Sequence, residues 1–112
     1  MLAAPHRLRR AADFTRTTRR GTKVAQGRVV VFVHRSGAGS GPRVGVVTSK
    51  AVGNSVERHR AARRIRAALA ALVEALPPGT DVVVKALPGA AGDPALQADV
   101  TAAVVSARSR WR

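Results

Sequence analysis

Residues 43–76, RVGVVTSKAVGNSVERHRAARRIRAALAALVEAL, carry the pattern that decides the fold. The β-branched run at 43–49 is typical of a strand. A long helix follows, which Asn54 or Ser55 can cap and which the Pro-Pro-Gly at 77–79 ends. A strand that leads directly into a long helix indicates a domain in which helices cover a sheet.

The two halves of this helix differ in chemistry. On a helical wheel, apolar side chains fall in one arc that should face the sheet, namely Ile65, Ala68, Leu69, Leu72, Val73 and Leu76. Basic side chains occupy the rest of the wheel in the N-terminal half, namely His59, Arg60, Arg63, Arg64 and Arg66, with Arg58 at the helix entrance. No acid lies between Glu57 and Glu74, so these charges repel one another and the positive end of the helix dipole. An ordinary solvated face interleaves acids with cations, so this pattern favours a phosphate-binding surface.

The flanking sequence supplies the remaining elements of one small domain over residues 1–112. We expect a helix at 11–20 that ends at a left-handed Gly21, strands at 28–34 and 81–87, and a weakly signalled strand at 22–27. The Gly- and Ser-rich stretch at 35–42 is typical of a hairpin loop. Asp93-Pro94 should start a last helix that buries Leu96, Val100, Val104 and Ala107. The predicted order is α-β-β-β-α-β-α, an α+β sheet covered by helices.

Charge narrows the class of partner. The chain has 20 Lys+Arg against 6 Asp+Glu, a net charge of +14, which favours a polyanion such as nucleic acid. The absence of cysteine excludes disulfides and thiolate sites, and no apolar run approaches the ~20 residues of a membrane span. GAGSG at 37–41 lacks the lysine of a phosphate loop. The scattered histidines and carboxylates predict no metal site and no acid–base pair. We expect a soluble, cytoplasmic protein.

Residues 49–69, SKAVGNSVERHRAARRIRAAL, resemble the signature segment of the protein subunit of bacterial ribonuclease P. The matching residues are Lys50, Gly53, Asn54, Val56, Arg58, Arg60, Arg63 and Arg66. Residues 6–33 also resemble the opening of that family, through Arg7-Leu8, Asp13-Phe14 and Gly21. Three positions depart from the family pattern: His59 replaces a usual Asn, Ala62 a common Lys, and Thr18 a common aromatic residue.

The resemblance implies a ribosomal protein S5 domain 2-like fold with a left-handed βαβ crossover. It also implies a non-catalytic subunit of ribonuclease P, the endoribonuclease that removes the 5′ leader of precursor tRNA. The partners would be the catalytic RNA and precursor tRNA, with no membrane and no DNA partner. Mg²⁺ would be used by the RNA, and no cofactor or metal would be bound by the protein.

The same resemblance assigns residues to two RNA ligands. Contacts to the RNA subunit would come from Lys50, Asn54, Arg58, His59, Arg60, Arg63, Arg64 and Arg66. Contacts to the leader would come from Arg7, Arg9, Arg10, Phe14, Arg16 and Phe32. No catalytic residue is assigned.

Four alternatives stay open at this point. The chain could be a ribosomal-type module that binds structured RNA without a nuclease role, or a nuclease in its own right. Phe14 and Phe32 could belong to the core, where most lone aromatic side chains lie. Asn54 could serve only as a helix cap.

Overall fold

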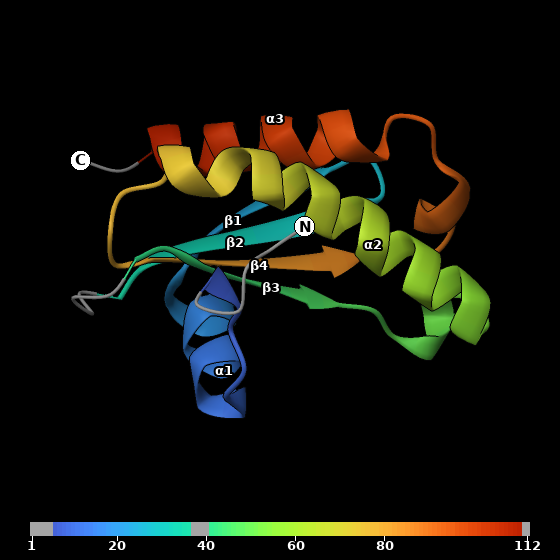
Figure 1. The fold of residues 1–112 in the computed structure, drawn as a ribbon, viewed down its shortest axis with the longest axis horizontal. Coiled ribbons are helices and arrows are strands. Elements are labelled where there is room, and N and C mark those ends of the chain that lie inside the picture. Colours follow the sequence, from blue (N-terminus) through green and yellow to red (C-terminus); the bar gives the residue numbers. More distant parts are fainter. Residues whose placement is uncertain (1–5, 37–40, 111–112) are drawn as a thin grey trace.

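The computed structural model of the chain describes residues 6–36 and 41–110. Its elements follow the predicted order (Figure 1). They are α1 (Ala11–Arg20), β1 (Thr22–Gln26), β2 (Val29–Arg35), β3 (Arg43–Val47), α2 (Ser55–Leu72), β4 (Thr80–Ala86) and α3 (Leu96–Ser109), with 3₁₀ turns η2 (Lys50–Val52), η3 (Val73–Ala75) and η4 (Ala90–Gly92). The weakly signalled strand at 22–27 is therefore present as β1, and the α+β class is confirmed.

The strands form one mixed sheet in the order β1-β2-β4-β3. β2 pairs antiparallel with both β1 and β4, whereas β3 pairs parallel with β4, with Arg43 opposite Asp81. β3, α2 and β4 thus form the βαβ unit that the resemblance requires. The prediction of a hairpin across 35–42 is wrong, because β4 lies between β2 and β3 and takes the hydrogen bonds that hairpin partners would share. Residues 37–40, most of GAGSG, lie outside the described residues.

Helices α2 and α3 cover one face of the sheet (Figure 1). Alternate residues of β2 point toward them, so Val29, Val31 and Val33 are fully buried. The predicted inward residues of α3 are all buried, and so is the predicted arc of α2 except for Leu72, which is half-buried. Each buried CH₂ group contributes about 0.8 kcal/mol, so this aliphatic layer is the main source of stability.

Helix α1 lies on the opposite face and covers only part of it (Figure 1). Arg43 of β3 donates hydrogen bonds of 3.0 and 3.1 Å to Asp81 of β4 and one of 3.2 Å to Asp13 of α1. The bonds to Asp81 are the largest cause that raises the pKa of Arg43 above its usual value. Asp13 and Asp81 are both buried, and a buried charge needs a partner, so this network holds α1 against the sheet.

Three predicted element ends differ in detail. Gly21 is not left-handed, since its φ is −74°; glycine fits there because a Cβ would collide with the carbonyl oxygen of Thr17. Helix α2 ends at Leu72 and passes through η3 before it reaches 77–79. The side chain of Asp93 accepts a hydrogen bond from the N–H of Ala95 at 3.0 Å, so it closes a turn and α3 begins only at Leu96.

Candidate nucleic-acid interface

The turn into α2 combines a helix N-terminus with exposed polar side chains. Gly53 has a φ of +148°, and a Cβ there would lie 2.8 Å from the Glu57 carboxyl carbon, so glycine is required. Asn54 caps the helix, because its side-chain oxygen accepts a hydrogen bond from the N–H of Glu57 at 2.9 Å. Lys50 and Asn54 are both exposed at this turn. The predicted cap is confirmed, and the positive end of the helix dipole opens to solvent.

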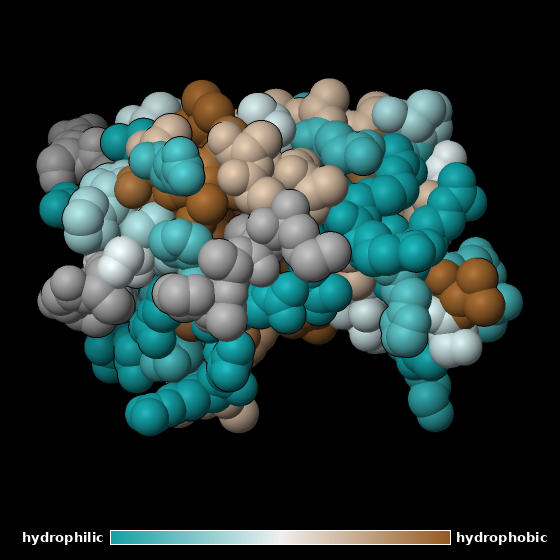
Figure 2. Space-filling view, in the orientation of Figure 1, coloured by the Kyte–Doolittle hydropathy of each residue, from teal (hydrophilic) through white to brown (hydrophobic). Residues whose placement is uncertain are grey.

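The first turns of α2 present basic side chains to solvent. His59, Arg60, Arg63 and Arg66, which we call the arginine face, are exposed, and Arg58 is half-buried. Within residues 6–36 and 41–110, no side chain of the arginine face makes an ion pair or a hydrogen bond. Figure 2 shows hydrophilic side chains gathered over this end of α2. The predicted row of uncompensated positive charge is therefore present on the surface.

Arg64 is on the same helix, but its side chain bonds to other parts of the protein. Its guanidinium donates to the carbonyl oxygen of Ala91 at 3.1 Å and to Oε1 of Gln97 at 2.6 Å. These bonds tie α2 to η4 and to the first turn of α3. The helical wheel grouped Arg64 with the arginine face. Its hydrogen bonds within the protein show that it does not belong to that exposed group.

The two phenylalanines lie on the sheet face that α1 leaves partly open. Phe32 of β2, Val83 of β4 and Gly45 of β3 form one row across the sheet. Phe14 of α1 is half-buried with its ring against Gly45, where a Cβ would collide with it. Phe32 is also half-buried, with Lys23 Nζ 6.0 Å from its ring centroid. Figure 2 shows a hollow below the sheet beside α1. Neither ring belongs to the core between the sheet and α2–α3.

The N-terminal arginines occupy different environments. Arg7 forms a parallel β-bridge with Val44, and the N–H of buried Leu8 donates to the carbonyl oxygen of Val44 at 2.8 Å, so this segment follows the free edge of β3. Arg9 and Arg10 are exposed just before α1. Arg16 pairs with Asp13 at 3.3 Å while 41% of its side chain stays exposed, so its charge is partly neutralised.

Three neighbouring hollows join the two groups of residues, and Arg66 lines all of them. The first, of about 80 Å³, includes Arg7, Phe14 and Gly45. The second, of about 280 Å³, includes Arg7 and Arg63. The third, of about 550 Å³, includes His59, Arg63 and Val56, a valine that is 72% exposed. The structure thus brings together residues that the sequence analysis assigned to different ligands.

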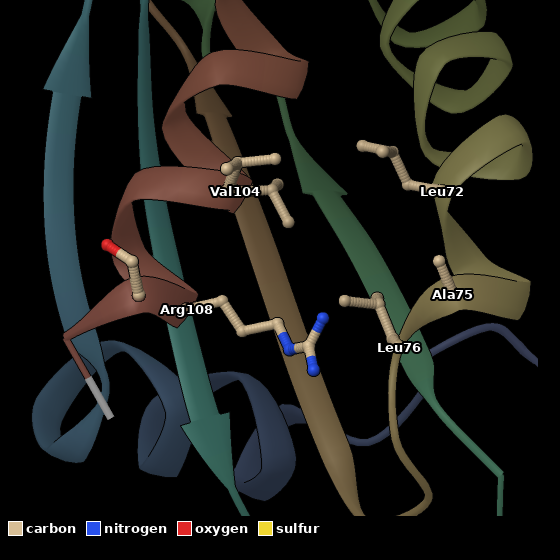
Figure 3. A pocket seen from close by; sticks show the side chains of 7 residues that line it. Leu72, Ala75, Leu76, Val104 and Arg108 are labelled. Atoms are coloured by element: carbon tan, nitrogen blue, oxygen red, sulfur yellow. The ribbon is translucent and has the colours of Figure 1, made fainter. Parts of the chain in front are cut away.

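A further groove lies between the end of α2 and α3 (Figure 3). It measures about 350 Å³ and is lined mainly by aliphatic side chains such as Leu72, Leu76 and Val104, and the side chain of Arg108 reaches across it toward Leu76. An apolar lining does not match a polyanion, so this groove is not part of the candidate interface. In the described part of the chain, no helix has the length and apolar character needed to cross a membrane.

A family model described as Ribonuclease P matches residues 2–108. The chain belongs to the ribonuclease P protein family. A relative from Mycolicibacterium vanbaalenii, named ribonuclease P protein component, is 46% identical over 98% of this chain and 96% of its own length. A relative of the same name from Beutenbergia cavernae is 53% identical over 81% of this chain and 76% of its own length.

Solved structures of ribonuclease P proteins share the fold. A Staphylococcus aureus RNase P protein mutant, described as defective in mRNA degradation activity, matches with a TM-score of 0.83 and 26% identity over 92% of this chain and 88% of that one. The RNase P protein from Thermotoga maritima matches with a TM-score of 0.71 and 21% identity over 95% and 97% of the two chains, which bears on the fold alone.

The resemblance stated from residues 49–69 and 6–33 is therefore confirmed. Its function is also confirmed, that of a protein component of ribonuclease P, an endoribonuclease, rather than of a ribosomal-type module. The general partners of a ribonuclease P protein are the ribonuclease P RNA and precursor tRNA.

Two lysines of this ribonuclease P protein were missed from sequence. Lys23 pairs with Phe32 and Lys85 pairs with Val30, so both lie on the open face of the sheet, where both are exposed. The signal was available, because each is an exposed lysine directly next to a buried valine in a strand, so its side chain points to the opposite face. They add positive charge beside Phe32.

Proposed function

We propose that this ribonuclease P protein binds its two RNA ligands on two surfaces. The arginine face, together with Lys50, Asn54 and Arg58, contacts the catalytic RNA. The open sheet face beside α1 contacts the 5′ leader of precursor tRNA. The observation that carries the proposal is the arginine face itself, a row of cations without a carboxylate partner in the described part of the chain.

The first surface suits folded RNA. Guanidinium groups bind phosphate oxygens in pairs, and the open N-terminus of α2 adds backbone N–H groups at the same end. The protein tolerates the repulsion among Arg60, Arg63 and Arg66 because a polyanion relieves it.

The second surface suits a single strand. A base stacked on an aromatic ring gains about 1–3 kcal/mol, and Phe14 and Phe32 each present a half-buried ring. Arg9, Arg10 and the two lysines beside Phe32 would meet phosphates on either side. We expect Arg7 and Arg16 to contribute less to leader affinity, since Arg7 also borders the arginine face and Arg16 pairs with Asp13.

Chemistry would rest with the RNA. Hydrolysis would be carried out by the RNA subunit with Mg²⁺, as the resemblance implies, while the protein contributes phosphate neutralisation and leader affinity. In residues 6–36 and 41–110, no three His, Asp or Glu side chains are grouped as metal ligands would be.

Reconstitution tests the first surface. The protein is added to a bacterial ribonuclease P RNA, and 5′ maturation of a precursor tRNA is measured at low Mg²⁺. We expect strong stimulation by the wild type and little by Arg60→Ala/Arg63→Ala at the same concentration. The matched control is Arg108→Ala/Arg110→Ala, which removes the same charge from α3 and its end. An equal loss of stimulation in both double variants would show that total charge, not the arginine face, is responsible, and no loss in either would remove the arginine face from the interface.

A leader series tests the second surface. The affinity of the assembled enzyme is measured for precursor tRNA with a leader and for mature tRNA without one. Phe14→Ala should weaken binding of the precursor by about 1–3 kcal/mol and leave mature tRNA unchanged. An unchanged precursor affinity in a variant that still binds the RNA subunit would remove Phe14 from the leader surface.

A further inference from the structure

Arg7, Arg63 and Arg66 line one hollow of about 280 Å³ between the N-terminal segment and α2. From the sequence, Arg7 is expected to contact the leader, whereas Arg63 and Arg66 are expected to contact the RNA subunit. In the fold they meet at the free edge of β3, where the two proposed surfaces adjoin.

We propose that these three arginines form a single site for one RNA backbone phosphate, which joins the two surfaces. This inference rests on the proposed function, because it assumes that both RNA ligands approach this side of the protein. It adds that Arg7 and Arg66 act on the same phosphate, although they come from segments that lie far apart in sequence.

The backbone of Arg7 is held in place by pairing with Val44 of β3. The β-bridge to Val44 and the 2.8 Å hydrogen bond from Leu8 hold this residue beside β3, and Leu8 is only 6% exposed. Arg63 and Arg66 follow at i,i+3 on α2, so they project from the same side of the helix.

The charges in this hollow have no counterpart within the described residues. No acid is among the residues that line it, and none of the three guanidiniums has an ion pair or hydrogen bond there. The carboxylate of Asp13 forms ion pairs with Arg16 and Arg43, and that of Asp81 forms one with Arg43. Like charges gathered from separate elements around one concavity cost free energy, which an anion in the concavity would recover. A phosphate diester fits because guanidinium forks match its oxygens.

The adjoining hollows show what the phosphate would connect. On one side, Arg7 and Arg66 border the hollow that contains Phe14; on the other, Arg63 and Arg66 border the one that contains His59. Arg66 therefore lies at the centre of a continuous path between the two surfaces. The phosphate comes either from the leader or from the catalytic RNA, and the two sources predict different measurements.

A double-mutant cycle tests the site. Arg7→Ala, Arg66→Ala and the double variant are measured in two arms. The first is affinity for the RNA subunit, and the second is affinity of the fully assembled enzyme for leader-bearing precursor, with protein in excess. Each single variant should lose about tenfold in affinity in the arm that reports the bound phosphate. The double variant should lose less than the product of the singles, by a factor of about 3 or more.

The control cycle pairs Arg66→Ala with Arg10→Ala, an exposed arginine that does not line the hollow. Its losses should multiply. Unfolding midpoints of all variants should match the wild type, because the altered side chains are exposed. Arg7→Lys keeps the charge but loses the fork, so it should fall between wild type and Arg7→Ala.

The two arms identify the RNA that supplies the phosphate. A shortfall from the product in the first arm assigns the phosphate to the catalytic RNA, and one in the second arm assigns it to the leader. Losses that multiply in both arms, or no loss in either, overturn the shared site. A wild-type protein that binds neither RNA would instead overturn the proposed function, which keeps the two failures distinct.

Discussion

The two halves of helix α2 serve different purposes. The N-terminal half exposes Arg60, Arg63 and Arg66 without compensating acids, whereas the C-terminal half buries Ile65 and Leu69 completely. The first half works against helix stability, since cations at a helix N-terminus are unfavourable. The second half packs on the sheet and α3 and holds the helix in place. A helix anchored by one end can therefore carry unfavourable charge at the other end.

Leu69→Ala would break the anchored half. Leu69 is fully buried, so its truncation should lower the free energy of unfolding by about 2–5 kcal/mol in a urea titration. Leu72→Ala is the matched control, because Leu72 is only half-buried and should cost less. Equal losses in the two variants would contradict the proposed role of the buried arc.

Arg60→Ala/Arg63→Ala would disrupt the exposed half, where we expect a loss of RNA affinity rather than of stability. RNA-subunit affinity should fall by about 100-fold, and the slope of log affinity against log salt should drop by about two units. Stability should stay level or rise, because the like-charge pair costs about 0.2–0.5 kcal/mol. A loss of unfolding free energy above about 1 kcal/mol would mean that these arginines hold the fold.

Arg64→Ala sharpens the comparison within two adjacent residues. Removing its hydrogen bonds to Ala91 and Gln97 should lower the free energy of unfolding by about 1–2 kcal/mol. Arg63→Ala, one residue away, should cost nothing measurable in the same assay. If the two variants behave alike, the contacts of Arg64 do not contribute to stability.

Asn54→Ala gives the smallest expected effect. The loss of its hydrogen bond to the N–H of Glu57 should cost about 1 kcal/mol of unfolding free energy. Ser55→Ala, at the next position, should be nearly neutral. The reverse result would assign the cap to Ser55.

Local patterns predicted what depends on neighbours in sequence. The β-branched runs located β2 and β4, and the wheel located the buried arc and the arginine face. Strand order was not predictable in this way, because the position of β4 between β2 and β3 depends on pairing between distant segments. The same limit hid the bond between Arg43 and Asp13, which are 30 residues apart.

The candidate site shows the same division. Residue type and spacing indicated which side chains are candidates for phosphate binding, since arginines without acidic neighbours destabilise a helix start unless an anion binds them. They could not separate Arg63 from Arg64, because only tertiary contact with Ala91 and Gln97 distinguishes them. Nor could they show that Arg7 meets Arg66, since that depends on the path of residues 7–8 along β3.

The path of residues 7–8 along β3 also bears on self-association. β3 is an outer strand of the sheet, and an uncovered outer strand can template intermolecular β-pairing and aggregation. The short stretch around Leu8 occupies part of this template by hydrogen-bonding to Val44. A recombinant version trimmed to start at Ala11 would leave the template open, and its tendency to self-associate would rise with concentration even if every helix still formed.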